Sequence, residues 1–526
     1  MNDKIKYITT TLPYANSKPH IGHAFEFIIG DALSRYFKYV KNETVLFNIG
    51  LDEHGLKIQE AAEKEGVTPQ EYVDELHKVW IDFTEKLKIN SYDNFYRTSD
   101  VDHYINVQKF WIELFNKGDI YKKKYKGTYC VGCESFKSDR DLIDEPTGKQ
   151  EVIPVDSHHL EPIIRPIRVC SDHPTTKLQE IEEENYFFRL SNYKQHFLQW
   201  LHIKPTFFEP ENKINEFDKI IEDLQDISIS RIKDTVSWGI PVPGDEDQTI
   251  YVWFDALLNY IFAAGYYDIE FRSNVQGFEG FWNKSEVIQI CGPDNLKFQS
   301  VIFQGLLTAA GIKKSNKLLV HGTILDKDGH KMSKTVGNVV DPIDQVKKYG
   351  IDAVRYYALA GISTYKNSSW DEDNLVVLHN SHLADDYGNL VARVSHLAGK
   401  ILEERREDIN VELDYSYVDS DKFAVILHDK IDTVKVLWDS YKISEALAET
   451  NKIVKSLNKK INDEKPWAHV HSGGWVTILE IHYAISLVND LYYPVIPEKA
   501  GLVRRSLREC KKYIIFPKIE KLETIK

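Results

Sequence analysis

Residues 20–23 (HIGH) combine side chains that are suited to phosphate chemistry, and residues 13–16 (PYAN) precede them. His20 and His23 can donate hydrogen bonds to a phosphoryl group, and Gly22 allows a nucleotide to approach the backbone closely. A string of four letters also arises by chance in a structural turn. We interpret the segment as a phosphate site, with the structural turn as the alternative.

Residues 321–335 (HGTILDKDGHKMSKT) form a second segment with suitable chemistry. Lys331 and Lys334 flank a Met-Ser pair in a polar loop that contains glycine. Two ammonium groups can hold pyrophosphate while negative charge develops on it. A solvated basic loop would explain this segment alone, but both segments serve the same chemistry. Together they favour a nucleotide site.

Alternating strand and helix patterns should position these segments. Residues 5–12 and 44–50 predict buried strands, and residues 24–39 predict an amphipathic helix between them. Strand–loop–helix order is typical of a nucleotide-binding unit, in which ligands lie at the carboxyl ends of parallel strands. The pattern resumes at residues 249–261 and 287–295. The chain therefore predicts an α/β fold.

Residues 121–231 interrupt this pattern with short strands, acidic helices and cysteines, which predicts an inserted domain. Two pairs of potential metal ligands in it have members three residues apart, which is the spacing of a Cys₃His site. Four protein ligands imply one structural Zn²⁺, and unligated thiols are the alternative. The expected ligands are Cys130, Cys133, Cys170 and His173, with His158 and His159 as rivals.

The chain after Trp370 is helical in pattern, for example at residues 380–404, and predicts a helix bundle. Asn389 and Arg393 lie one helical turn apart, and Trp467 follows a polar run. Such residues can stack on and hydrogen-bond to unpaired bases, although buried structural roles are the alternative.

Composition narrows the function classes. A chain of 526 residues needs several modules. A net charge of −14 argues against indiscriminate coating of nucleic acid, although local basic runs at 122–127 and 504–512 could still hold a large, shaped nucleic acid. Five cysteines, an odd number, argue against a disulfide framework. No signal-peptide pattern and no run of eighteen apolar residues occur, so we expect a cytoplasmic protein without membrane attachment.

The two phosphate segments resemble the HIGH and KMSKS signatures of class I aminoacyl-tRNA synthetases, the second ending here in Thr335. Residues 12–16, 52–55 and 251–256 resemble the methionine enzymes of that class. This resemblance implies activation of L-methionine with ATP and Mg²⁺ to methionyl-adenylate and pyrophosphate. Transfer of the methionyl group to the terminal adenosine of tRNA(Met) would follow.

The resemblance also implies roles for individual residues. Catalysis is expected from His20, His23, Lys331 and Lys334, and ATP binding from Gly22, Gly292, Asp294, His321 and Lys334. Methionine is expected to contact Leu12, Tyr14, Asp52, Trp253, Ala256 and Tyr260, with Asp52 taking its ammonium group. Anticodon bases are expected at Asn389, Arg393 and Trp467. Many relatives carry Lys, His and Trp where this chain has Pro293, Gln299 and Phe303.

The expected domains are a Rossmann-like doubly wound parallel-sheet catalytic domain in two halves (1–120 and 232–322), a zinc-bearing connective-peptide insert (121–231), a loop and stem region (323–370), and an all-α anticodon-binding bundle (371–526). Some family members add a dimer-forming domain after this point, so we expect a monomer.

Two other enzymes and one binding protein are alternatives. A different class I synthetase would share both signatures, and a small-molecule adenylyltransferase would share only the first. A tRNA-binding protein descended from a synthetase would not need His20, His23, Asp52, Lys331 and Lys334.

Overall fold

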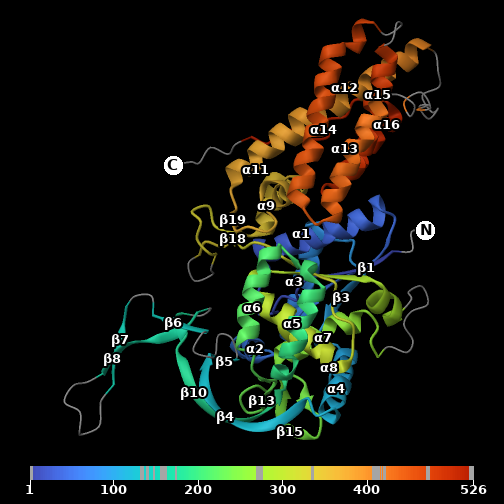
Figure 1. Ribbon diagram of the computed structural model, residues 1–526. Coiled ribbons are helices and arrows are strands. Elements are labelled where there is room, and N and C mark those ends of the chain that lie inside the picture. Colours follow the sequence, from blue (N-terminus) through green and yellow to red (C-terminus); the bar gives the residue numbers. More distant parts are fainter. Residues whose placement is uncertain are drawn as a thin grey trace.

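The computed structural model describes residues 4–130, 135–137, 141–145, 148–153, 163–171, 174–267, 277–332, 337–405, 415, 418, 422–469 and 474–520. Figure 1 shows an α/β region with a β-rich arm on one side and a helical C-terminal region on the other.

A six-stranded parallel sheet forms the centre of the α/β region, in the order β11-β17-β16-β1-β2-β3. Its strands are β1 (Ile5–Thr9), β2 (Thr44–Leu51), β3 (Asn94–Arg97), β11 (Phe208–Glu209), β16 (Glu286–Cys291) and β17 (Lys317–Val320). The order runs outward in opposite directions from β1 and β16, so a topological switch point lies between these strands. The predicted α/β fold is confirmed, although the first strand ends at Thr9, before residue 12.

Helix α1 (Ile21–Arg35) follows β1, and a π-helical segment η1 (Tyr36–Val40) continues it. All residues of α1 except Gly22 and His23 are buried, so this helix lies inside the fold. The other helices of this region are α2 (Leu56–Glu65), α3 (Pro69–Lys86), α4 (Val101–Asn116), α5 (Lys194–Ile203), α6 (Ile214–Glu222), α7 (Val252–Ala263) and α8 (Phe303–Ala310).

Helix α7 is held against the sheet by two buried polar contacts. The Asn48 amide donates to Asn259 Oδ1 at 3.0 Å, and the Tyr7 hydroxyl donates to the carbonyl of Tyr260 at 2.8 Å. These bonds fix α7 relative to β1 and β2, which carry the loops that close the site.

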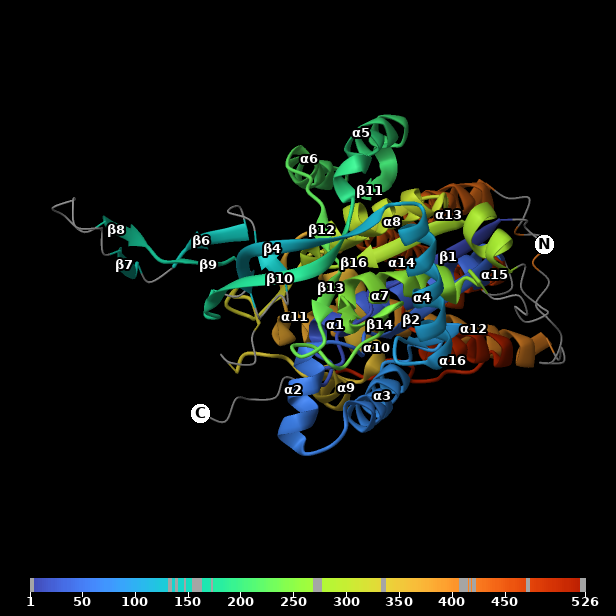
Figure 2. The ribbon, with the colours of Figure 1, turned by 90° about the horizontal axis from the view of Figure 1, so that it is seen from below.

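The arm is built on β4 (Ile120–Cys130) and β10 (Leu178–Phe188), which pair antiparallel over their whole length. Figure 2 shows it projecting away from the sheet, with the antiparallel strand pairs β6–β9 and β7–β8 toward its end. Our prediction of short strands here is wrong for β4 and β10, which have eleven residues each. Lys124 lies opposite Glu184 and Lys126 opposite Glu182, and such cross-strand pairs of opposite charge stabilise a ribbon.

Further short strands are β5 (Ser135–Lys137), β6 (Leu142–Asp144), β7 (Gln150–Ile153), β8 (Ile163–Pro166), β9 (Arg168–Cys170), β12 (Ile227–Ser228), β13 (Ser230–Ile232), β14 (Pro241–Val242), β15 (Asp245–Ile250), β18 (Ile324–Leu325) and β19 (Ser368–Ser369).

The C-terminal region is helical, as predicted. Its helices are α9 (Pro342–Tyr349), α10 (Ile351–Tyr356), α11 (Glu372–Leu378), α12 (Asn389–Arg405), α13 (Lys422–Asp439), α14 (Ile443–Glu464), α15 (Gly474–Tyr492) and α16 (Pro497–Glu509). Figure 1 shows α12 to α16 side by side above the α/β region. Among the described residues, no helix is both long and apolar enough to cross a membrane.

A buried ion pair joins α1 to the helical region. Arg355, on α10, donates to Asp31 Oδ2 at 2.6 Å, and both side chains are fully buried. The same guanidinium donates to the carbonyls of Val495 at 2.8 Å and Leu87 at 3.1 Å. Burial alone would raise the pKa of Asp31, but the positive charges of Arg355 and Arg35 lower it. One side chain therefore holds together α1, the loop after α3 and the loop after α15.

We expect Arg355→Met to lower the free energy of unfolding by about 3 kcal/mol or more, because it leaves a buried carboxylate with one cation fewer. Chemical denaturation measures the loss. Arg504→Met is the matched control, since Arg504 forms an exposed pair with Asp490 at 2.8 Å and should contribute little. Equal midpoints for the two variants would contradict the importance of the buried pair.

Candidate active site at the carboxyl edge of the sheet

Loops from four neighbouring strands meet at the carboxyl edge of the sheet. They follow β1, β2, β16 and β17, so they flank the switch point. Tyr14 forms a bridge with Asp52, and the Ala15 amide donates to the Asp52 carbonyl at 2.8 Å. The His321 amide donates to the Cys291 carbonyl at 3.0 Å. The strand order thus brings segments almost 300 residues apart into one site.

His20 and His23 lie at the N-terminus of α1, with their rings stacked at 3.7 Å. The Gly22 amide donates to His20 Nδ1 at 3.1 Å, and the His20 amide donates to His23 Nδ1 at 3.2 Å. A nitrogen that accepts a backbone N–H carries no proton, so each neutral ring is protonated at Nε2. The local capping geometry therefore gives two Nε2–H donors beside the positive end of a helix dipole.

His321 is linked to α1 by an ion pair. Its Nε2 donates to Glu26 Oε2 at 3.0 Å, its Nδ1 donates to the Gly322 carbonyl at 2.8 Å, and both side chains are buried. Burial would lower the pKa of His321, but the hydrogen bond and charge of Glu26 raise it above its usual value. Glu26 also accepts from the amide and hydroxyl of Thr11, each at 2.6 Å. The pair fixes the loop after β17 against α1.

Gly292 and Asp294 follow β16 and pack closely beside His321. A Cβ atom at Gly292 would lie 2.8 Å from Asp294 Oδ1, so only glycine fits without a shift. Pro293 begins a short 3₁₀ helix (Pro293–Asn295). Many relatives carry lysine at this position, whereas proline has no backbone N–H to donate.

Several aromatic side chains line the side of the site that α7 forms. The Trp253 and Phe298 rings stack at 3.7 Å with an interplanar angle of 14°. Tyr260 packs edge-on against Phe303 at 5.2 Å, and its hydroxyl accepts a bond from Gln299 Nε2 at 2.7 Å. Leu12, Ala256 and Tyr260 are buried. The two substituted positions, Gln299 and Phe303, therefore both contact Tyr260.

We did not predict from the sequence that the carboxylate of Asp255, on α7, is part of this site. Asp255 accepts from His54 Nδ1 at 3.0 Å, and His103 Nε2 lies 3.8 Å from its other oxygen. Burial would raise the pKa of Asp255, but the charge and hydrogen bonds of His54 and His103 lower it. Charged residues within an apolar helical run, such as Asp255 and Glu26, were the available signal.

Several other expected site residues are exposed or lie outside the described residues. Lys331 is exposed and forms a bridge with Leu325, whereas Lys334 lies outside the described residues. Cys130 and Cys170 are buried, but Cys133, His158, His159 and His173 also fall outside them. Within the ranges described, no cluster of three or more potential metal ligands occurs.

On the helical region, the guanidinium of Arg393 lies over the ring of Trp467 at 4.4 Å. It also donates to Asn462 Oδ1 at 2.6 Å. Trp467 is 42% exposed, and Asn389 is exposed one turn before Arg393 on α12. The three residues predicted to bind bases therefore share an exposed surface, where a flat cation and an indole are already stacked.

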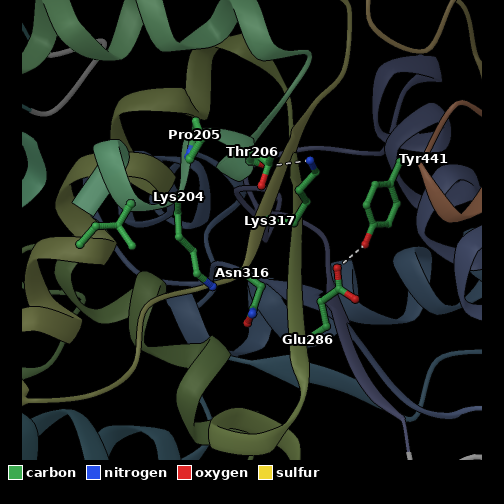
Figure 3. Close-up of a pocket in the computed structure, with 8 residues that line it drawn as sticks. Lys204, Pro205, Thr206, Glu286, Asn316, Lys317 and Tyr441 are labelled. Atoms are coloured by element: carbon green, nitrogen blue, oxygen red, sulfur yellow. Dashed lines mark hydrogen bonds between the residues drawn. The ribbon is translucent and has the colours of Figure 1, made fainter. Parts of the chain in front are cut away.

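A separate pocket of about 350 Å³ lies at the opposite edge of the sheet. Glu286 and Lys317, which begin β16 and β17, line it together with Tyr441 of the helical region (Figure 3). Tyr441 donates to Glu286 at 2.7 Å, and Lys317 donates to the Thr206 carbonyl at 2.7 Å. Because ligands of such sheets bind at the carboxyl ends, this pocket is not the candidate active site.

Comparisons with known proteins agree with this geometry. The family model described as tRNA synthetases class I (M) matches residues 6–395. The methionine–tRNA ligase of Thermotoga maritima is 36% identical over 504 residues, which cover 95% of this chain and 74% of that protein. The methionine–tRNA ligase of Nostoc sp. is 34% identical over 515 residues, which cover 96% and 90%.

A solved structure, Mycobacterium tuberculosis methionyl-tRNA synthetase in complex with methionyl-adenylate, matches with a TM-score of 0.82 at 31% identity. The match covers 95% of this chain and 93% of that one. The chain therefore belongs to the class I tRNA synthetase family of the methionine type, which confirms the resemblance inferred from its motifs.

We expect Glu26→Gln to reduce stability by about 2 kcal/mol at pH 6, because it removes a charged hydrogen bond. The pKa of His321 is raised in the folded state, so this stabilisation is present below the unfolded pKa of about 6.5. It is lost as pH rises through the folded pKa. Chemical denaturation at pH 6 and pH 9 should therefore give a larger difference between wild type and variant at pH 6.

The same substitution in a His321→Asn background is the control, in which the pH dependence of the difference should vanish. A difference that grows toward pH 9 would contradict the assignment of the charge to His321.

Proposed function

We propose that this chain activates L-methionine with ATP and then transfers the methionyl group to the 3′-terminal adenosine of tRNA(Met). The observation that carries this proposal is the likeness, over 95% of the chain, to a synthetase solved with methionyl-adenylate. The family match and the phosphate-binding geometry at the carboxyl edge support it.

In the first step, a carboxylate oxygen of methionine attacks the α-phosphorus of ATP in line. The bond from this phosphorus to the bridging oxygen breaks, and pyrophosphate leaves with Mg²⁺. His20 and His23 donate from Nε2 to phosphate oxygens, and this requires no further proton transfer. Lys331 and Lys334 neutralise the charge that develops on pyrophosphate. Catalysis thus arises from positioning and electrostatics.

The ATP and methionine sites share this edge. Gly22 and Gly292 allow the nucleotide to approach the backbone, Asp294 accepts from the ribose, and His321, held in place by Glu26, packs beside Gly292. The Asp52 carboxylate takes the ammonium group of methionine. The side chain of methionine contacts Leu12, Tyr14, Trp253, Ala256 and Tyr260, since aromatic groups suit a polarizable sulfur.

In the second step, a hydroxyl of the terminal adenosine attacks the carbonyl carbon of the adenylate, and AMP leaves. Asn389, Arg393 and Trp467 bind anticodon bases by hydrogen bonding and stacking. The exposed face of Trp467 and its contact with Arg393 support this role.

One structural Zn²⁺ belongs to the arm, with Cys130, Cys133, Cys170 and His173 as ligands. Cys130 and Cys170 fit this role because both are buried at strand ends and neither forms a disulfide. When bound, the ion would hold the thiolate-bearing turns together. The cytoplasmic location and monomeric state stay predictions.

We expect Lys331→Ala to lower the rate of adenylate formation about 100-fold, because its charge acts mainly on the transition state. ATP–pyrophosphate exchange measures this rate, and calorimetry measures methionine binding, which should change little. Lys327→Ala is the control, since Lys327 is exposed in the same segment. If Lys331→Ala exchanged ATP and pyrophosphate at the wild-type rate, Lys331 would have no role in the mechanism.

We expect Trp467→Ala to lower kcat/KM for tRNA about tenfold, because a stacked base contributes about 1–3 kcal/mol. Charging of tRNA with labelled methionine measures this loss, while methionine-dependent exchange should be unchanged. Val476→Ala is the control, because Val476 is 46% exposed on neighbouring α15. Equal losses in both assays would indicate a folding role for Trp467.

A further inference from the structure

A short hairpin carries Lys331. Leu325 and Lys331 form an antiparallel bridge, and the Asp326 N–H donates to the His330 carbonyl at 2.9 Å. Gly329 closes the turn at a φ of +83°, in a left-handed conformation that glycine adopts readily. The backbone of Lys331 is therefore placed by the turn that precedes it.

The carboxylate of Asp326 organises this hairpin. Its Oδ1 accepts from the backbone N–H of Asp328 at 3.0 Å and from that of His330 at 2.8 Å. Its Oδ2 accepts from Nδ2 of Asn338 at 2.8 Å. The bonds from Asn338 and from the His330 amide lower the pKa of Asp326, so this group is ionised at neutral pH. One side chain thus fixes the turn and binds a residue that follows the lysine-bearing segment.

The orientation of the Asn338 amide follows from this charge. An ionised carboxylate only accepts hydrogen bonds, so the NH₂ group of Asn338, and not its oxygen, must face Asp326. The same NH₂ group donates to the Lys331 carbonyl at 3.4 Å. Asn338 therefore contacts the hairpin at two points, one of which is the backbone of Lys331 itself.

Residues 338–340 also reach the N-terminus of α1. The carbonyl of Val340 accepts from the N–H of Ile21 at 3.2 Å. Ile21 is the first residue of α1 and follows His20, the N-cap of this helix. The segment therefore contacts the hairpin at one end and α1 at the other, and it connects the two phosphate segments.

We propose that Asp326 and Asn338 are positioning residues, which set Lys331 relative to the N-terminus of α1. This inference rests on the proposed function, in which Lys331 acts on the leaving pyrophosphate while the histidines of α1 act on phosphate oxygens. A catalytic group displaced by about 1 Å can lose about 100-fold in rate. The pair should affect the chemical step and not methionine binding, because the residues assigned to methionine lie on α7 and on the loops after β1 and β2.

The test is Asp326→Asn. The new amide oxygen can still accept from the backbone, but the new NH₂ group meets the NH₂ group of Asn338, and two donors cannot bond. ATP–pyrophosphate exchange should show a kcat about tenfold lower, with an unchanged KM for methionine. Asp328→Asn is the matched control, because it removes the same charge from an exposed position in the same turn and should leave kcat at the wild-type value.

Two further variants separate positioning from a general effect on the loop. In the double variant Asp326→Asn and Asn338→Asp, donor and acceptor change places, so kcat should recover to within about threefold of wild type. Asn338→Asp alone sets two carboxylates together and should lower kcat at least as much as Asp326→Asn. In a Lys331→Ala background, Asp326→Asn should cause little further loss, because the positioned group is already absent.

A wild-type kcat in Asp326→Asn, an equal loss in Asp328→Asn, or no recovery in the double variant would overturn the inference. An equal loss from Asp326→Asn in the Lys331→Ala background would overturn it as well. The proposed function fails in a different way, through the absence of methionine-dependent exchange in the wild-type protein.

Discussion

The buried helix α1 is the element on which the rest of the site depends. Its N-terminus presents His20 and His23, its middle holds His321 through Glu26, and its last turns hold Arg355 through Asp31. The two ion pairs thus join the helix that carries His20 and His23 to the loop after β17 and to the helical region. Removing one partner of a buried ion pair leaves an uncompensated charge and is strongly destabilising, so each pair constrains the position of α1. The residues that would act on ATP are therefore positioned from both ends of the chain.

The parallel sheet explains why distant segments meet. The loops after β1, β2, β16 and β17 lie at one edge because their strands run in the same direction, and the reversal of order between β1 and β16 opens a place for a ligand. Helix α7 then closes this place with aromatic side chains, and the Tyr260 hydroxyl accepts a hydrogen bond from Gln299. In the proposed mechanism, nucleotide and amino-acid chemistry share this edge, while the anticodon-binding residues lie on the helical region.

Much of this arrangement could be predicted from local patterns. The strands near residues 5 and 44, the helix after Gly22 and the helical C-terminal region all follow from periodicity. The long ribbon of β4 and β10 could not, because it pairs strands that lie far apart in the sequence, such as Lys124 with Glu184. The same limit applies to Glu26, Asp255 and Gln299, since only the fold shows which buried polar group meets which partner. Asp52 and His321 could be assigned beforehand only by resemblance to a family.

The central claim is that this edge of the sheet joins methionine, and no other amino acid, to the α-phosphate of ATP. The most direct measurement is ATP–pyrophosphate exchange by the purified protein with Mg²⁺ and each of the twenty amino acids in turn. The account predicts exchange with methionine alone. Exchange with a different amino acid would contradict the assignment of the pocket around Tyr260, and exchange with none would contradict the assignment of the chemistry.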